Sequence, residues 1–234
     1  MGSSIGVEKQ CLIQSLLSKA LLIVLALVCY PLLSVVPTHG RTPNEVPDPP
    51  LTSLSACAAG LSDSVIVSAR KGDHAALVEL YNSVQTGRCS NSVKALVNWL
   101  ELASSHGLPD AMFELAARLE LGEAVAYDVE RALKLYLRLA ETGHVLAQHR
   151  AGLLILRSAQ SNELRQEALN WLGTASSNGH GLSALILGHL YEQGAHGVPQ
   201  EKCTALHWYE ASSFLGMIAG KRYEKKLAAQ RPCD

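Results

Sequence analysis

The sequence predicts an all-α protein: a right-handed α/α solenoid of about four helix-turn-helix repeats, preceded by an N-terminal hydrophobic helix. Two observations support this fold class. Residues 20–36 form an uncharged apolar run. Further along, glycines recur every 35 to 37 residues, and apolar residues at helical spacing follow each glycine. Self-similarity at such a period is typical of helical repeat arrays. The recurring glycines are Gly72, Gly107, Gly143, Gly179 and Gly216.

Composition supports a folded helical domain without a nucleic-acid partner. Apolar residues make up 48% of the 234 residues, aromatic residues 5% and charged residues 18%, which suits a core of leucine and alanine. Beyond the N-terminal segment, basic and acidic residues nearly balance, and the formal net charge of the chain is −1. Since nucleic-acid binding needs a basic field, we expect no nucleic-acid partner.

The N-terminal segment predicts export. Residues 1–19 carry Lys9 and Lys19 and form a cytoplasmic n-region, and residues 20–36 form a signal or transmembrane segment. The length of the apolar run lies between that of a secretory signal and that of a spanning helix. An uncleaved segment anchors the protein in the cytoplasmic membrane with its N-terminus inside. Cleavage near Gly40 makes the domain periplasmic or secreted. Both outcomes place the repeat domain outside the cytoplasm.

A proline-rich linker follows at residues 37–56, and five of the nine prolines fall within residues 37–50. Proline favours extended backbone and lacks an amide donor, so this stretch predicts a semi-rigid spacer. The repeat domain then occupies residues 57–234. Its predicted units lie near residues 72–106, 107–142, 143–178 and 179–215.

Each unit is predicted to pair two helices around a small interior. In the first helix, the fourth and eighth residues after the glycine are small or apolar: Ala76, Ala111, Ala147 and Ser183, then Leu80, Leu115, Ala151 and Leu187. In the second helix, large residues stand eight and seven positions before the next glycine: Trp99, Leu135, Trp171 and Trp208, then Leu100, Tyr136, Leu172 and Tyr209. Large side chains over small ones fill such a hairpin, and we expect Trp171 to be largely buried.

The fourth unit carries the most specific pattern, with LGHLYEQG at 187–194, GVPQ at 197–200 and ALHWYE at 205–210. In these residues the sequence resembles the Sel-one-like (SLR) repeats, a branch of the tetratricopeptide-type helical repeats, over roughly residues 60–227. Other units depart from the pattern at single positions, such as Ala116 for the glycine and Leu135 for the tryptophan. The resemblance implies a scaffold that presents a concave surface to protein partners.

Helix phase predicts which residues face that partner-binding groove. If offsets 4, 8 and 12 from each glycine point inward, offsets 6, 10 and 13 face the groove. Aromatic and imidazole side chains among them would supply the main contacts, namely Phe113, His149 and His189. The full predicted set is Val78, Asn82, Gln85, Phe113, Ala117, Glu120, His149, Leu153, Leu156, Leu185, His189 and Glu192.

Motifs for catalysis or cofactor binding are weak, so we expect no enzyme, cofactor or metal. Nine histidines form no HExxH pair, and His144 and His180 each follow a repeat glycine, where a polar residue helps to start a helix. Ser68 and Lys71 fit S-x-x-K, but its companion K-T-G is missing. The C-terminal stretch from Lys221 to Arg231 is basic, which suits either a solvated helix or a docking site for an acidic partner.

Four cysteines lie in the predicted exported part. Their positions within the repeat period pair Cys57 with Cys89 and Cys203 with Cys233, one pair at each end of the array, where a terminal unit lacks a neighbour. Four free thiols are the alternative.

The sequence therefore favours a non-enzymatic scaffold or regulatory adaptor in the cell envelope, with protein partners that are themselves envelope or membrane proteins. Two alternatives stay open at this stage: an envelope enzyme acting on a cell-wall-derived or β-lactam-like substrate, and a secreted factor acting on another cell. A nucleophile with an oriented base in one pocket would favour the enzyme.

Overall fold

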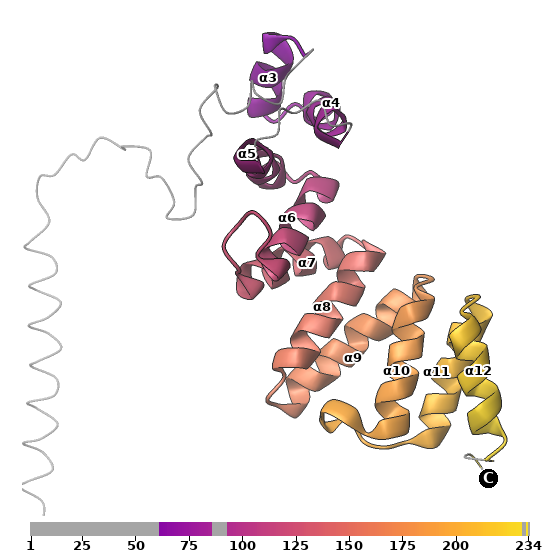
Figure 1. The fold of residues 1–234 in the computed structure, drawn as a ribbon. Coiled ribbons are helices and arrows are strands. Elements are labelled where there is room, and N and C mark those ends of the chain that lie inside the picture. Colours follow the sequence, from indigo (N-terminus) through magenta and orange to yellow (C-terminus); the bar gives the residue numbers. More distant parts are fainter. Residues whose placement is uncertain (1–60, 86–92, 231–232, 234) are drawn as a thin grey trace, which may run out of the picture. The chain divides into compact units, whose positions relative to one another are not determined.

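The computed structural model describes residues 61–85, 93–230 and 233 (Figure 1). Predictions for residues 1–60, which include the apolar segment, the linker and Cys57, lie outside these residues, as does Cys89. The Cys57–Cys89 pair therefore stays a prediction. No helix in the described part of the chain is both long enough and apolar enough to cross a membrane.

The described residues form ten α-helices, one short 3-10 helix and no strands. They therefore confirm the predicted all-α fold. In order, the helices are α3 (Asp63–Arg70), α4 (His74–Gln85), α5 (Val93–Ser105), α6 (Pro109–Leu121), α7 (Val129–Glu141), α8 (Val145–Ser158), α9 (Asn162–Ser177), α10 (Gly181–Gln193), η1 (Ala195–Gly197), α11 (Lys202–Phe214) and α12 (Ile218–Ala228).

The helices pair as the glycine period predicts. The pairs α4 and α5, α6 and α7, α8 and α9, and α10 and α11 form the four units, while α3 precedes the first unit and α12 follows the last glycine as the first helix of a further unit. From α5 to α12, each helix packs against the next one along the chain (Figure 1). This sequential packing is that of a solenoid.

The repeat glycines end the second helices because they adopt a left-handed backbone. All five have positive φ, between 79° and 94°, a region that glycine enters without steric cost. At Gly143, its amide donates to Ala140 O at 3.0 Å and the next amide donates to Leu139 O at 3.1 Å. This pair of bonds is a Schellman motif, and it satisfies carbonyls that the helix end would leave free. The turn then starts α8, where His144 Nδ1 accepts from Ala147 N at 3.2 Å.

The core follows the predicted inward offsets. The residues seven positions before the glycines are fully buried: Leu100, Tyr136, Leu172 and Tyr209. Trp99 is buried too, whereas Trp171 and Trp208 have intermediate exposure and pack against the buried core residues.

Candidate functional site

The predicted groove residues do not share one environment. Three of them are buried, contrary to prediction: His149 is 8% exposed, Leu156 6% and Leu185 8%. Neighbouring units cover these side chains, and the phase of a single helix cannot predict contacts between units. Phe113 is partly buried and stacks on His144, with ring centroids 5.0 Å apart. Asn82 is exposed, Val78, Ala117 and Leu153 are partly buried, and the side chain of Gln85 lies outside the described residues.

Two of the predicted groove residues instead anchor buried tyrosines. Tyr136 OH donates to Glu120 Oε2 at 3.1 Å, and Tyr209 OH donates to Glu192 Oε2 at 2.5 Å. Burial and the neighbouring glutamate raise the pKa of each tyrosine, so both hydroxyls keep their protons. In the third unit the equivalent positions hold Leu156 and Leu172, both buried. The same position in the hairpin is therefore filled by a tyrosine–glutamate pair in the second and fourth units and by two leucines in the third.

A polar cluster joins the third and fourth units. Ser183 Oγ lies 2.9 Å from His149 Nδ1 and 2.8 Å from His180 Nδ1, and the two imidazole centroids are 4.4 Å apart. Burial, then His180 and Arg150, lower the pKa of His149 to about 4, and burial lowers the pKa of His180. Ser183 is fully buried, so its hydroxyl is not exposed to solvent. The cluster is a structural joint between α8 and α10.

A surface hollow of about 570 Å³ lies between α10, the start of α11 and α12. We call it the C-terminal hollow. It contains two of the predicted groove residues, His189 and Glu192, and six residues that helix phase did not select. Its lining consists of His189, Glu192, Gln193, Gln200, Lys202, Tyr223, Lys226 and Gln230.

A hydrogen-bond chain fixes the imidazole at the base of the C-terminal hollow. Tyr209 has one hydroxyl proton and donates it to Glu192, so His189 Nδ1, 2.9 Å from the same hydroxyl, must be the donor in that contact. The proton on Nδ1 leaves Nε2 as an acceptor in the neutral ring. The His189 side chain is 32% exposed and packs edge-on against Tyr223, with centroids 4.4 Å apart. Nε2 has no hydrogen-bond partner among the described residues.

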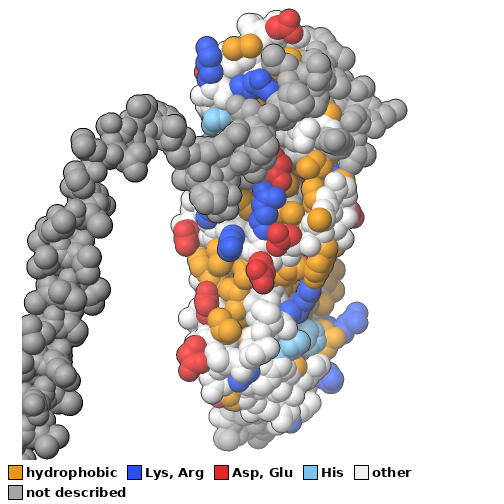
Figure 2. Space-filling model, turned by 90° about the vertical axis from the view of Figure 1, so that its left-hand side faces the viewer, with side chains coloured by type: hydrophobic (Ala, Val, Ile, Leu, Met, Phe, Trp, Pro, Cys, Tyr) orange, Lys and Arg blue, Asp and Glu red, His pale blue; other side chains and the backbone are white. Residues whose placement is uncertain are grey.

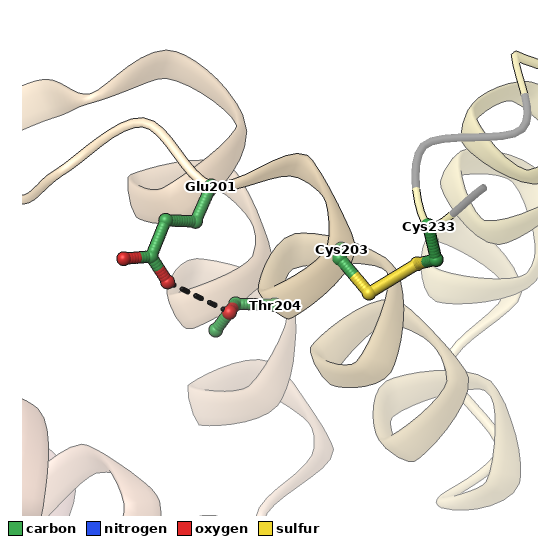
Figure 3. Close-up of a disulfide and its surroundings, with 4 residues drawn as sticks. All are labelled: Glu201, Cys203, Thr204 and Cys233. Carbon is green, nitrogen blue, oxygen red and sulfur yellow. Dashed lines mark hydrogen bonds between the residues drawn. A yellow bond between two sulfur atoms is a disulfide. The ribbon is translucent and has the colours of Figure 1, made fainter.

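The rim of the hollow is basic and is tied together covalently. Lys202 Nζ donates to Gln230 Oε1 at 3.4 Å, while Lys226 belongs to the basic C-terminal stretch. Next to Lys202, Cys203 forms a disulfide with Cys233, the partner that the repeat positions predict, with their Cα atoms 5.1 Å apart (Figure 3). Figure 3 also shows Thr204 donating to the Glu201 carboxylate at the start of α11, at 2.9 Å. The bridge joins the start of α11 to the segment that follows α12.

The features expected of an enzyme do not come together in the described residues. Ser68 lies on α3 and Lys71 caps that helix, and no side-chain hydrogen bond between them is present there, although the Lys71 amide donates to Ser68 O at 3.0 Å. Within the same described part, no group of three histidine, cysteine or acidic residues could hold a metal. On the face in Figure 2, basic and acidic side chains are interspersed with hydrophobic ones, and neither sign dominates.

Comparison with known families decides what the repeats are. The Sel1 repeat model matches residues 109–144, 145–180 and 181–216. Each match starts on the first residue of a first helix, namely α6, α8 and α10. Residues 109–216 are three Sel1 repeats. The unit formed by α4 and α5 precedes the matched Sel1 repeats and continues their spacing.

Solved structures with Sel1 repeats share the fold. A Sel1 repeat protein from Oxalobacter formigenes is 22% identical with a TM-score of 0.54, over 65% of this chain and 62% of that one. An SLR-fold protective antigen of uropathogenic Escherichia coli strains is 20% identical with a TM-score of 0.52, over 71% of this chain and 40% of the antigen. The aligned region thus spans less than two thirds of either relative. No curated protein matches the chain.

Proposed function

We propose that the protein is a non-enzymatic adaptor that binds a protein partner at the C-terminal hollow. Sel1 repeat proteins generally act as protein-interaction scaffolds. The proposal rests on the exposed and polar lining of this hollow. Five of its eight lining residues are exposed, namely Gln193, Gln200, Lys202, Lys226 and Gln230. An open, polar surface of this kind suits a polypeptide segment better than an enclosed substrate.

Photo-crosslinking from single positions tests this proposal. A benzophenone amino acid replaces Gln193, an exposed residue that lines the hollow, in the full-length protein expressed in its own host. The matched control carries the same group at Lys134, an exposed residue of α7. We expect a discrete crosslinked protein from position 193 and none from position 134. Crosslinks from position 134 alone would show that the partner binds elsewhere. The absence of crosslinks from both positions would contradict an adaptor role.

We also propose that the repeat domain acts in the cell envelope. The uncharged run at residues 20–36, preceded by Lys9 and Lys19, supports export. The partner would then be an envelope or membrane protein. A reporter enzyme that is active only outside the cytoplasm, fused after Asp234, tests the location. We expect reporter activity from the full chain and its loss when residues 20–36 are deleted. Equal activity with and without the segment would refute this role for it.

A further inference from the structure

We propose that the C-terminal hollow recognises an acidic segment of the partner, with a carboxylate held between Lys202 and Lys226 and a backbone amide donating to His189 Nε2. This inference rests on the proposed adaptor function and names the chemistry of the bound segment. Three properties of the site support it. The hollow is basic, His189 Nε2 is an acceptor without a partner among the described residues, and Glu192 is already hydrogen-bonded to Tyr209.

The charge of the hollow favours an anion. The lining holds two lysines, Lys202 and Lys226, and one carboxylate, Glu192. Beyond the lining, α12 adds Lys221, Arg222 and Lys225 against Glu224. Basic side chains around an open hollow attract acidic segments and speed their encounter. On the one face drawn in Figure 2 the two signs are mixed, so the lysines of the hollow and of α12 mark where an acidic segment would dock.

The acceptor in the hollow is His189 Nε2. Because Tyr209 commits its proton to Glu192, His189 Nδ1 holds the ring proton and Nε2 presents a lone pair. A peptide supplies a donor of the required kind in each backbone N–H. Contact with Tyr223 restrains the ring, so little side-chain entropy is lost on binding.

Glu192 does not cancel this preference. Its Oε2 accepts the Tyr209 hydroxyl at 2.5 Å, and its side chain is 20% exposed. The carboxylate is therefore turned toward the core of the unit, where it holds the tyrosine. The lysines have no such internal acid partner: Lys202 contacts the neutral amide of Gln230, and Lys226 forms no ion pair with any described residue.

Binding of a defined peptide tests the inference. A fluorescein-labelled glutamate-rich peptide is titrated with the full-length protein and followed by fluorescence polarisation. The comparison peptide has glutamine at each glutamate position. We expect the glutamate peptide to bind more tightly, and its affinity to fall as salt concentration rises. Equal binding of the two peptides would refute recognition of acidic groups.

Matched charge variants locate the binding. Lys202→Gln/Lys226→Gln removes the two lysines of the hollow, and Lys221→Gln/Lys225→Gln removes the same charge from exposed positions outside its lining. We expect the first variant to weaken binding about two- to fivefold per lysine, as for exposed charge pairs, and the second to weaken it less. Equal loss in both variants would show a diffuse charge effect and overturn the site. All four substitutions are at exposed positions, so unfolding does not confound the comparison.

The acidic-segment inference and the adaptor proposal fail in different ways. A partner crosslinked from position 193 together with no binding of the glutamate peptide would refute the acidic segment alone. The absence of any crosslinked protein from position 193 or 134 would refute the adaptor, whatever the peptide does.

Discussion

Gly188 lies against the ring of Tyr209, so closely that a Cβ added to Gly188 would come within 2.5 Å of Tyr209 Cδ1. The third unit repeats this relation, because a Cβ at Gly152 would come within 2.9 Å of Leu172 Cγ. In both units the glycine faces the buried side chain seven positions before the next repeat glycine. The first helix thus has a glycine at the point where the second helix places a large buried side chain.

Gly188→Ala should destabilise the protein. Overpacking a core costs about 1–3 kcal/mol, which exceeds the gain of about 0.5–1 kcal/mol from replacing a mid-helix glycine. Gly173→Ala is the control, because its Cβ would lie 3.6 Å from Trp208 Cη2, an ordinary contact. We expect the urea midpoint to fall for Gly188→Ala and to rise for Gly173→Ala. A rise for both would show that the Tyr209 ring moves aside freely.

Leu172→Ala should cost more than Trp171→Ala despite the smaller side chain. Leu172 is fully buried, whereas Trp171 is partly exposed. Truncating a buried leucine costs about 2–5 kcal/mol, and a partly exposed side chain loses less apolar contact. Denaturant unfolding of the two variants measures the order. A larger loss for Trp171→Ala would place the hairpin interior one residue earlier.

Tyr136 and Glu120 should be energetically coupled. Tyr136→Leu alone leaves Glu120 without its tyrosine donor, at a cost of about 1–3 kcal/mol. Tyr136→Leu/Glu120→Leu reproduces the buried Leu172 and Leu156 pair of the next unit. We expect the double variant to be more stable than the sum of the single changes implies, by about 1 kcal/mol in a double-mutant cycle. Strict additivity would contradict the coupling.

Acid should weaken the joint between the third and fourth units. Burial lowers the pKa of His149 from 6.5 to about 4, so the unfolded chain binds more protons than the folded one between these values. The contribution to stability is fully present above pH 6.5, falls as the pH drops toward 4, and amounts to about 3 kcal/mol. His180, next to the same Ser183 hydroxyl, shifts in the same direction.

Thermal unfolding across this pH range measures the effect, with His149→Gln as the comparison variant. The variant should lose part of the pH dependence, because it removes one titrating ring while Ser183, His180 and Arg150 remain. An unchanged pH profile would show that His149 does not control it.

The disulfide should stabilise the last helix locally. Cys203 and Cys233 are separated by 30 residues, and closing a loop of that length contributes about 3–4 kcal/mol. In Cys203→Ser/Cys233→Ser we expect faster amide exchange in α12 and unchanged exchange in α6. Unchanged exchange in α12 would show that packing against α11 alone holds the helix.

The repeat could be read from the sequence because its markers act locally. The backbone at Gly143 is left-handed, and this conformation favours glycine whatever residues surround it. The position of His149 shows the opposite case. Its phase on α8 suggests exposure, yet Ser183 and His180 come from the next unit and cover it.

The C-terminal hollow could be predicted only in part for the same reason. Helix phase selected His189 and Glu192, since both lie on α10. It did not select Lys202 and Lys226, because they reach the hollow from α11 and α12. Their approach depends on how three helices pack, which the period of one helix does not specify. The resemblance at residues 187–210 identified the repeat type but carried no information about this surface.

The position of the Cys203–Cys233 bridge has a mechanical consequence. Tension applied to the chain at Cys233 passes through the sulfur atoms to the first turn of α11, and it bypasses the residues between them. The last helix, which lies between the two cysteines, therefore bears no load while the bridge is intact. A pull at Cys233 therefore acts on the first turn of α11 and on its packing against α10, and not on the contacts of α12.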